Sequence, residues 1–249
     1  MSGPRVAPLR LAHVEPRPEV VVAVAPDEPP PGCEALIVQP ALAGAARIGT
    51  PGRAGGRIVV RASLPGIGGR YLVQVARNAA AGGWAAEELA ALVVELERRC
   101  SYLLLASTVG PVVASGPRRS LVHGPRRAVA WDGGGWSGAR TRDLAASART
   151  VSGRGYLCAA ATSGSTPPRA VASTLADLTA TGVLVGRITH GVAATLGASW
   201  AVELLGAPPL SGAQLQSLRE QFGAAPRCDW CGLPVVGRHC RRCSPGRHS

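Results

Sequence analysis

Residues 84–106 read WAAEELAALVVELERRCSYLLLA, and this stretch decides the fold of the first half of the chain. Leu89 and Val93 are four positions apart within a pattern of apolar residues that has helical spacing. Two glutamates stand near the start of the pattern and two arginines near its end, as the helix dipole favours. An apolar run over 102–106 follows directly and is typical of a strand. The sequence therefore predicts a helix over 84–99 followed by a strand.

Short β-branched runs precede this helix, with glycine and proline between them, at 35–38, 57–62 and 71–77. Runs of this kind favour antiparallel strands, so we expect a small α+β domain over 34–109, and no chemistry is visible in it. Proline is concentrated in residues 1–33, which we interpret as a tail with one expected strand.

The composition of the chain indicates a globular protein with a basic surface. It has 249 residues, 46% of them hydrophobic, and a formal net charge of +12, which excludes a disulfide miniprotein and an acidic disordered tail. All 27 basic residues are arginine, as expected from a GC-rich genome, yet acidic residues do not balance them. We therefore prefer a polyanionic partner over a merely basic surface.

The positive charge is concentrated in two parts of the chain. Residues 110–154 hold eight arginines and two acids, and residues 207–249 hold six arginines and two acids. Within a Gly/Pro/Arg-rich linker predicted over 110–139, two arginine doublets could follow a phosphate backbone. Their four residues are Arg118, Arg119, Arg126 and Arg127. The alternative is a solvated loop.

Residues 160–205 suggest a helix, a glycine and two strand-like runs joined by a loop. The segment VASTLADLTATGVLVGRI over 171–188 resembles the recognition helix and first wing strand of winged helix-turn-helix domains. The resemblance implies a winged-helix module over 140–206, with DNA contacts from Arg169, Ser173 and Thr174. The alternative is a helix and a hairpin that only pack together.

Four cysteines near the C-terminus form a CxxC-x8-CxxC pattern, which resembles a short zinc ribbon over 227–249. The pattern predicts one structural Zn²⁺ held by Cys228, Cys231, Cys240 and Cys243. Three arginines of the ribbon would then face nucleic acid, namely Arg238, Arg241 and Arg242. The alternatives are a protein partner at the ribbon or stabilisation of the C-terminus alone. In the segment before it, 207–226, we expect a short amphipathic helix capped by Ser211.

Together these patterns predict an α+β protein that binds nucleic acid and contains zinc. Double-stranded DNA is the preferred partner, in transcriptional regulation or replication of a GC-rich bacterium, plasmid or phage, and homodimers are common among winged-helix regulators. The competing hypothesis is a structural, assembly or virion protein that coats nucleic acid and binds partner proteins through the ribbon. We expect no enzymatic activity, because histidines and clustered acids are scarce. The N-terminus and the absence of an 18-residue apolar run favour a cytoplasmic protein without a membrane span.

Overall fold

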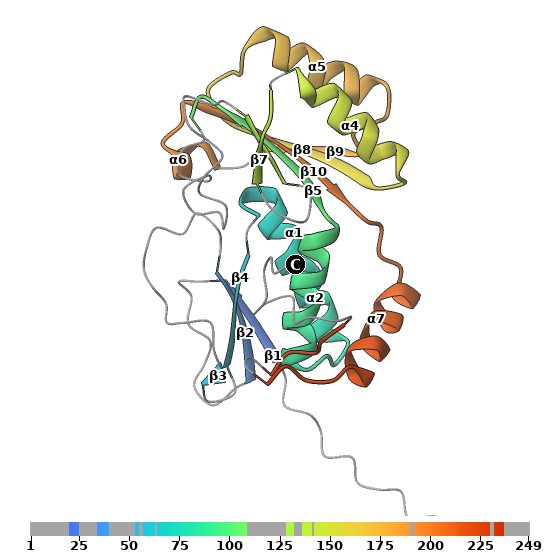
Figure 1. Cartoon of the computed structure of the whole chain (residues 1–249). Coiled ribbons are helices and arrows are strands. Elements are labelled where there is room, and N and C mark those ends of the chain that lie inside the picture. The colour runs from blue at the N-terminus through green and yellow to red at the C-terminus, as the bar shows by residue number, and fades with distance from the viewer. Residues whose placement is uncertain are drawn as a thin grey trace, which may run out of the picture.

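A computed structural model places two β-sheets on either side of a pair of helices (Figure 1). The structure describes residues 20–24, 34–39, 53–54, 57–62, 64–108, 128–131, 136–140, 142–189, 192–229 and 232–236. Helices and strands are mixed along the chain, which agrees with the expected mixture of α and β structure.

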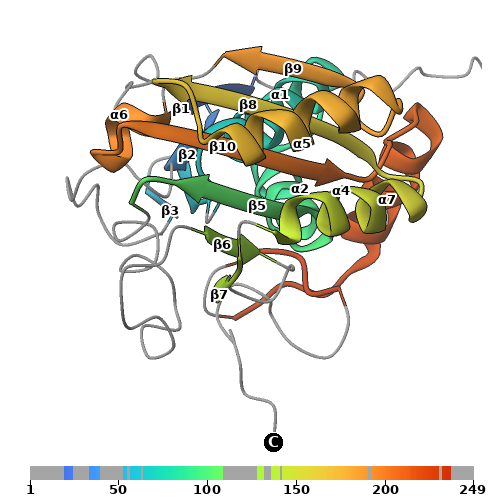
Figure 2. The same cartoon turned by 90° about the horizontal axis from the view of Figure 1, so that it is seen from above.

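The larger sheet has six strands in the order β7-β6-β5-β10-β8-β9 (Figure 2). Neighbouring strands are antiparallel, except that β8 and β9 are parallel. Helices α4 (Asp143–Gly153) and α5 (Arg169–Ala180) cover its outer face. The strands are β5 (Ser101–Ala106), β6 (Ala128–Trp131), β7 (Trp136–Gly138), β8 (Leu157–Gly164), β9 (Gly186–Thr189) and β10 (Trp200–Ala207).

The smaller sheet has the order β1-β2-β4-β3, with parallel pairs β1–β2 and β2–β4 and an antiparallel pair β3–β4. Helices α1 (Gly66–Ala81) and α2 (Ala86–Arg99) lie between the two sheets (Figure 1). Helix α1 packs against β1 and β10, so it contacts both sheets, while α2 packs against β2 and β4. The strands are β1 (Val20–Val24), β2 (Glu34–Gln39), β3 (Arg53–Ala54) and β4 (Arg57–Arg61).

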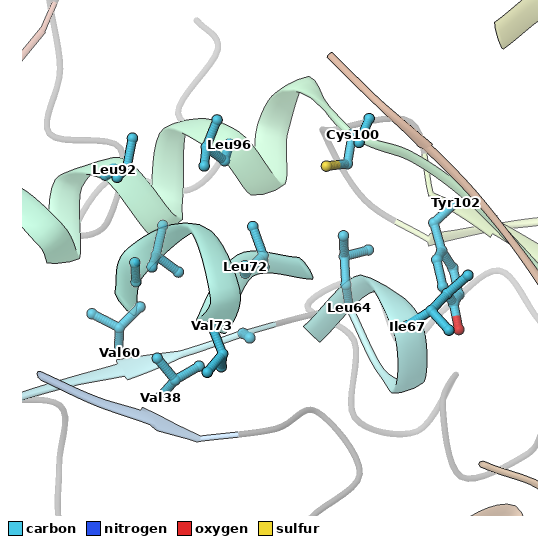
Figure 3. Close-up of a cluster of buried hydrophobic side chains, with 14 of the residues drawn as sticks. Val38, Val60, Leu64, Ile67, Leu72, Val73, Leu92, Leu96, Cys100 and Tyr102 are labelled. Carbon is cyan, nitrogen blue, oxygen red and sulfur yellow. The ribbon is translucent and has the colours of Figure 1, made fainter. Parts of the chain in front are cut away.

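One apolar core runs from the smaller sheet through the helix pair to the inner face of the larger sheet. Its middle is shown in Figure 3, where Val38 and Val60 of the smaller sheet lie next to α1 and Tyr102 of β5 lies beyond it. A second core fills the space between the outer face of the larger sheet and helices α4 and α5. Because both sheets contribute side chains to the first core, they are packed together through the helix pair.

Two further helices belong to the described chain. Helix α6 (Val192–Leu196) stands between β9 and β10 in sequence, and α7 (Gly212–Ala224) packs against α2. Ser211 caps α7 through a capping box with Gln214, so the amphipathic helix expected there is confirmed. The ring of Phe222 on α7 meets the ring of Trp84 edge to face, with 6.4 Å between centroids.

The local predictions for 84–106 are confirmed, because α2 and β5 occupy that stretch. The strand expected at 71–77 is wrong, since these residues belong to α1. Leu72, Val73, Ala76 and Ala79 form the buried side of that helix, so their helical spacing outweighed the β-branched and aromatic residues among them. The expected antiparallel unit is also wrong, because β1, β2 and β4 run parallel.

The winged-helix prediction is contradicted by the strand order. A wing needs its two strands to pair as an antiparallel hairpin, but β9 pairs in parallel with β8, and β10 lies between β8 and β5. Helix α5 is a connection that packs on the outer face of the sheet through Val171, Leu175 and Leu178. The same local order of elements is therefore compatible with a different sheet topology.

Candidate functional site

The described DNA-contact candidates all lie on α5. Arg169 and Ser173 are exposed on α5, and Thr174 turns its hydroxyl back to donate to the Ala170 carbonyl at 2.8 Å. The other candidates lie outside the described residues, namely Arg118, Arg119, Arg126, Arg127, Arg238, Arg241 and Arg242.

Of the predicted zinc ligands, only Cys228 belongs to the described chain, because Cys231, Cys240 and Cys243 lie outside it. The Cys228 carbonyl accepts a hydrogen bond from the Gly232 backbone N–H, which closes a turn. Within the residues that the structure describes, no group of three His, Cys, Asp or Glu side chains could hold a metal ion.

A buried carboxylate in the centre of the larger sheet is the most unusual group in the described chain. Glu203 stands on β10 with none of its surface exposed. Its Oε1 atom accepts hydrogen bonds from the backbone N–H of Ile67, at 3.0 Å, and from the hydroxyl of Tyr102. Its Oε2 atom is buried and has no hydrogen-bond partner among the residues that the structure describes.

The start of α1 explains why a carboxylate is held at this place. Pro65 occupies the N-cap and provides no side-chain acceptor, and the first turn of α1 has no acidic residue. The first N–H groups of a helix need acceptors, and the positive end of its dipole favours a negative charge. Glu203 provides the acceptor from another element of the fold. Gly66 makes this approach feasible, because a Cβ atom at 66 would overlap the Glu203 carboxylate.

The surroundings of Glu203 favour its neutral form. Burial raises the pKa of the carboxyl group, and the bonds from Tyr102 and Ile67 and the charge of Arg70 lower it by less, so the pKa lies above its usual value. Burial and the neighbouring Glu203 also hold the pKa of the Tyr102 hydroxyl well above its usual value. The pair therefore retains its protons more readily than the same groups would in water.

The inner face of the larger sheet becomes open to solvent towards the β9 edge. The register places Leu157 and Ala159 of β8 on this inner face with Leu205 and Ala207, and it places Ile188 of β9 beside Ala161. Leu157 is 50% exposed and Ile188 is 49% exposed. We call the inner-face residues Leu157, Ala159 and Ile188 the β8–β9 strip. Large aliphatic side chains on one face of two neighbouring strands make an apolar surface that extends beyond the sheet's own core.

A buried carboxyl group shares this face of the sheet with the strip. One row across the inner face runs from Ile188 through Ala161 to Glu203, and both Ala161 and Glu203 are buried. Arg70, on the exposed side of the first turns of α1, is close enough for its charge to lower the pKa of Glu203. The exposed strip and the buried carboxyl group are therefore separate features of one sheet face.

Sequence reasoning missed Glu203 because its strand was interpreted as part of a wing. The available signal was one acidic residue inside the apolar run WAVELLGA of 200–207. An acid in a buried strand is costly unless it is paired, so such a residue indicates a tertiary partner or a site.

Solved structures similar to this chain include three DegV family proteins. One from Corynebacterium glutamicum is 15% identical, with a TM-score of 0.48, and the match covers 71% of this chain and 76% of that one. A protein from Thermus thermophilus, described by its fatty acid binding, has 16% identity, a TM-score of 0.49 and coverage of 70% and 71%. DegV from Bacillus subtilis, described as a fatty acid binding protein, has 12% identity, a TM-score of 0.44 and coverage of 69% and 71%. No family model and no curated protein matches the sequence.

These findings contradict the expected zinc-containing DNA-binding protein and its structural or virion alternative. The strand order excludes the wing on which DNA binding was predicted. The predictions of double-stranded DNA as partner and of a protein partner at a ribbon fall with it. Among the described residues, which include only Cys228 of the four predicted ligands, no group could hold the predicted structural Zn²⁺. No helix in the described part of the chain has the length and apolarity needed to cross a membrane.

Proposed function

We propose that this protein binds a ligand with a long alkyl chain and an anionic head group, such as a fatty acid. The observation that carries this proposal is the β8–β9 strip, in which Leu157 and Ile188 stand half-exposed on one face of neighbouring strands. The proposed role is binding without catalysis, and the proposed location is the cytoplasm.

The strip supports binding of the alkyl chain. Leu157 and Ile188 lie on neighbouring strands of one face, so an extended chain can contact both at once. Each methylene group that leaves water for apolar contact contributes about 0.8 kcal/mol. A chain that reaches beyond both side chains would therefore gain several such contributions, which is sufficient for specific binding of an otherwise flexible molecule.

Arg70 supports binding of the head group. Arg70 is exposed in the first turns of α1, and a planar guanidinium can donate two parallel hydrogen bonds to one carboxylate. A fatty acid carries both the chain and the carboxylate that such a surface would bind. It is also the ligand named for some of the similar structures and is therefore the natural first probe.

The experiment is a titration of the full chain with a fluorescent long-chain fatty acid and displacement by unlabelled palmitate. Ile188→Asp and Leu157→Asp place a charge on the strip, and we expect each to weaken binding by roughly tenfold or more. The matched control is Val185→Asp, because Val185 is 65% exposed, stands just before β9 and lies outside the strip. Equal affinities for all four proteins, or no binding by the unaltered chain, would overturn the proposal.

A further inference from the structure

Helix α4 presents arginine side chains to solvent on the outer side of the larger sheet. Arg142 is its N-cap residue, Arg149 lies within it and Arg154 is its C-cap residue, and all three are exposed. Within the described part of the chain, no hydrogen bond or ion pair involves their guanidinium groups. Three positive charges therefore face solvent along one helix.

Acidic residues do not balance these charges. Residues 140–181, which hold α4, β8 and α5, contain five arginines and two acids. The Asp143 carboxylate accepts a hydrogen bond from the Arg140 backbone N–H at 2.7 Å, at the start of α4. The other acid, Asp177, is exposed on α5, and Arg169 is exposed at the start of the same helix. Since α4 and α5 pack side by side (Figure 2), this side of the larger sheet carries a net positive charge.

Two exposed aliphatic side chains lie beside the C-terminal end of α4. Only two residues separate Arg154 from Leu157, the first residue of β8, which is 50% exposed. Val185 is 65% exposed, and its backbone N–H donates to the Cys158 carbonyl at 2.8 Å, so it stands beside the start of β8. We call Arg149, Arg154, Leu157 and Val185 the α4–β9 corner. Cationic and exposed aliphatic side chains therefore meet at one end of the sheet.

We propose that the α4–β9 corner docks on the surface of a bilayer that contains anionic lipids. The guanidinium groups of Arg149 and Arg154 pair with the phosphate groups of the lipid heads. Leu157 and Val185 enter the boundary between the head groups and the acyl chains, where apolar side chains of peripheral proteins are buried. The inference goes beyond the proposed function, because docking requires no bound ligand.

Charge complementarity favours a bilayer over the other occupants of such a surface. A second copy of this chain would bring arginines against arginines, and Asp177 is the only exposed acid that the described α4 and α5 offer in return. A nucleic-acid duplex would pair with the arginines but would leave Val185 in water. An anionic bilayer has negative head groups directly above apolar chains, so it matches both parts of the corner.

The test measures co-sedimentation of the full chain with vesicles of two compositions. Vesicles of phosphatidylcholine alone have no net charge, and vesicles that also contain phosphatidylglycerol are anionic. We expect binding to the anionic vesicles only, and we expect it to weaken as sodium chloride is added, because salt screens the attraction between exposed charges. Equal binding to both compositions, or no binding to either, would overturn the inference.

Charge reversal tests the two arginines of the corner. One positive charge near an anionic surface changes the affinity about fivefold, and a reversal counts as two charges. Arg149→Glu and Arg154→Glu should therefore each weaken binding to the anionic vesicles by about 25-fold. The matched control is Arg227→Glu, because Arg227 is exposed after α7 and lies outside the corner, and its effect should stay within about twofold. Equal losses in all three variants would overturn the inference.

Val185→Asp and Ile188→Asp separate docking on vesicles from binding of a fatty acid. Val185 belongs to the corner, whereas Ile188 belongs to the strip alone. We expect Val185→Asp to weaken vesicle binding by about tenfold or more and to keep the affinity for the fatty acid, and we expect Ile188→Asp to do the reverse. Vesicle binding that survives Val185→Asp but not Ile188→Asp would overturn the inference. Binding to duplex DNA that Arg149→Glu weakens, without binding to either kind of vesicle, would overturn it as well.

Discussion

Gly66 is the residue at which the helix pair meets the larger sheet. Its φ of +49° lies in the left-handed region, and its lack of a side chain lets Glu203 reach the first N–H groups of α1. Two separate requirements, one conformational and one steric, therefore act at the same position. Few other residues of the described chain combine a positive φ with a close approach of this kind.

Replacing Gly66 with alanine should destabilise the protein more than a positive φ alone explains. The left-handed conformation costs an alanine about 1–2 kcal/mol, and the new Cβ would also displace the Glu203 carboxylate, so we expect a total loss of about 3 kcal/mol or more. Urea unfolding measures the difference. Gly83→Ala is the matched control, because Gly83 has a φ of +75° but open space around its Cβ position. Equal losses in the two variants would show that the Glu203 carboxylate moves away from the new Cβ atom without a cost in the free energy of unfolding.

Glu95 should make stability depend on pH in the acidic range. Burial raises the pKa of its carboxyl group, but hydrogen bonds from Arg98 and Arg99 and their charges outweigh burial, so the pKa lies below its usual value. The stabilisation is therefore complete above the unfolded pKa of about 4.3 and is lost as the pH falls through the folded pKa.

At pH 7 we expect Glu95→Gln to lower the free energy of unfolding by no more than about 1 kcal/mol, because both arginines are more than a third exposed. Urea unfolding at pH 7 and at pH 3 measures the effect, and the difference between the two proteins should be smaller at pH 3. Asp177→Asn, an exposed acid on α5, is the control. A difference that is undiminished at pH 3 would contradict the argument.

At the scale of elements, α7 is attached to α2 by few contacts. Leu218 and Phe222 are its buried side chains, and the Arg219 guanidinium lies 5.8 Å from the centre of the Trp84 ring and pairs with Glu88 at 3.5 Å. Phe222 contributes the larger apolar surface, so α7 depends mainly on this ring.

Phe222→Ala should cost about 3 kcal/mol and loosen α7 selectively. Hydrogen exchange would show the amides of α7 exchanging faster while those of β10 keep their order of protection. The exposed neighbour Gln221→Ala should leave the exchange of α7 unchanged. If Phe222→Ala accelerated both elements equally, α7 would be part of the global folding unit rather than an attached helix.

For the whole molecule, the shared core predicts that both sheets unfold together. Leu36 and Val60 of the smaller sheet belong to the same buried cluster as Leu104 and Leu205 of the larger sheet, with α1 and α2 between them. In native-state hydrogen exchange with added urea, the slowest amides of β2 and β10 should therefore converge on one free energy. A clearly lower value for β2 would indicate that the smaller sheet opens independently.

Local sequence patterns were sufficient to predict part of this fold. The sequence by itself determined α2, β5 and α7, because each carries its own periodicity, charge placement or cap within a few residues. It did not distinguish α1 from a strand, because Tyr71 and Val73 favour β structure while their neighbours share a helical face. For residues 71–77 the preferences for helix and for strand are of similar strength, and packing between the two sheets decided in favour of the helix.

The tertiary structure alone decided which strands are neighbours and what Glu203 does. Hydrophobic periodicity specifies which face of a strand is buried, but it carries no information on the strand beside it. The order of helix and strands over 160–207 therefore predicted a wing, whereas long-range pairing placed β10 next to β5 and left β9 at an edge. That pairing brought Glu203 to the start of α1, 136 positions from Ile67 in sequence, because a buried carboxylate and an uncapped helix each lacked a partner nearby.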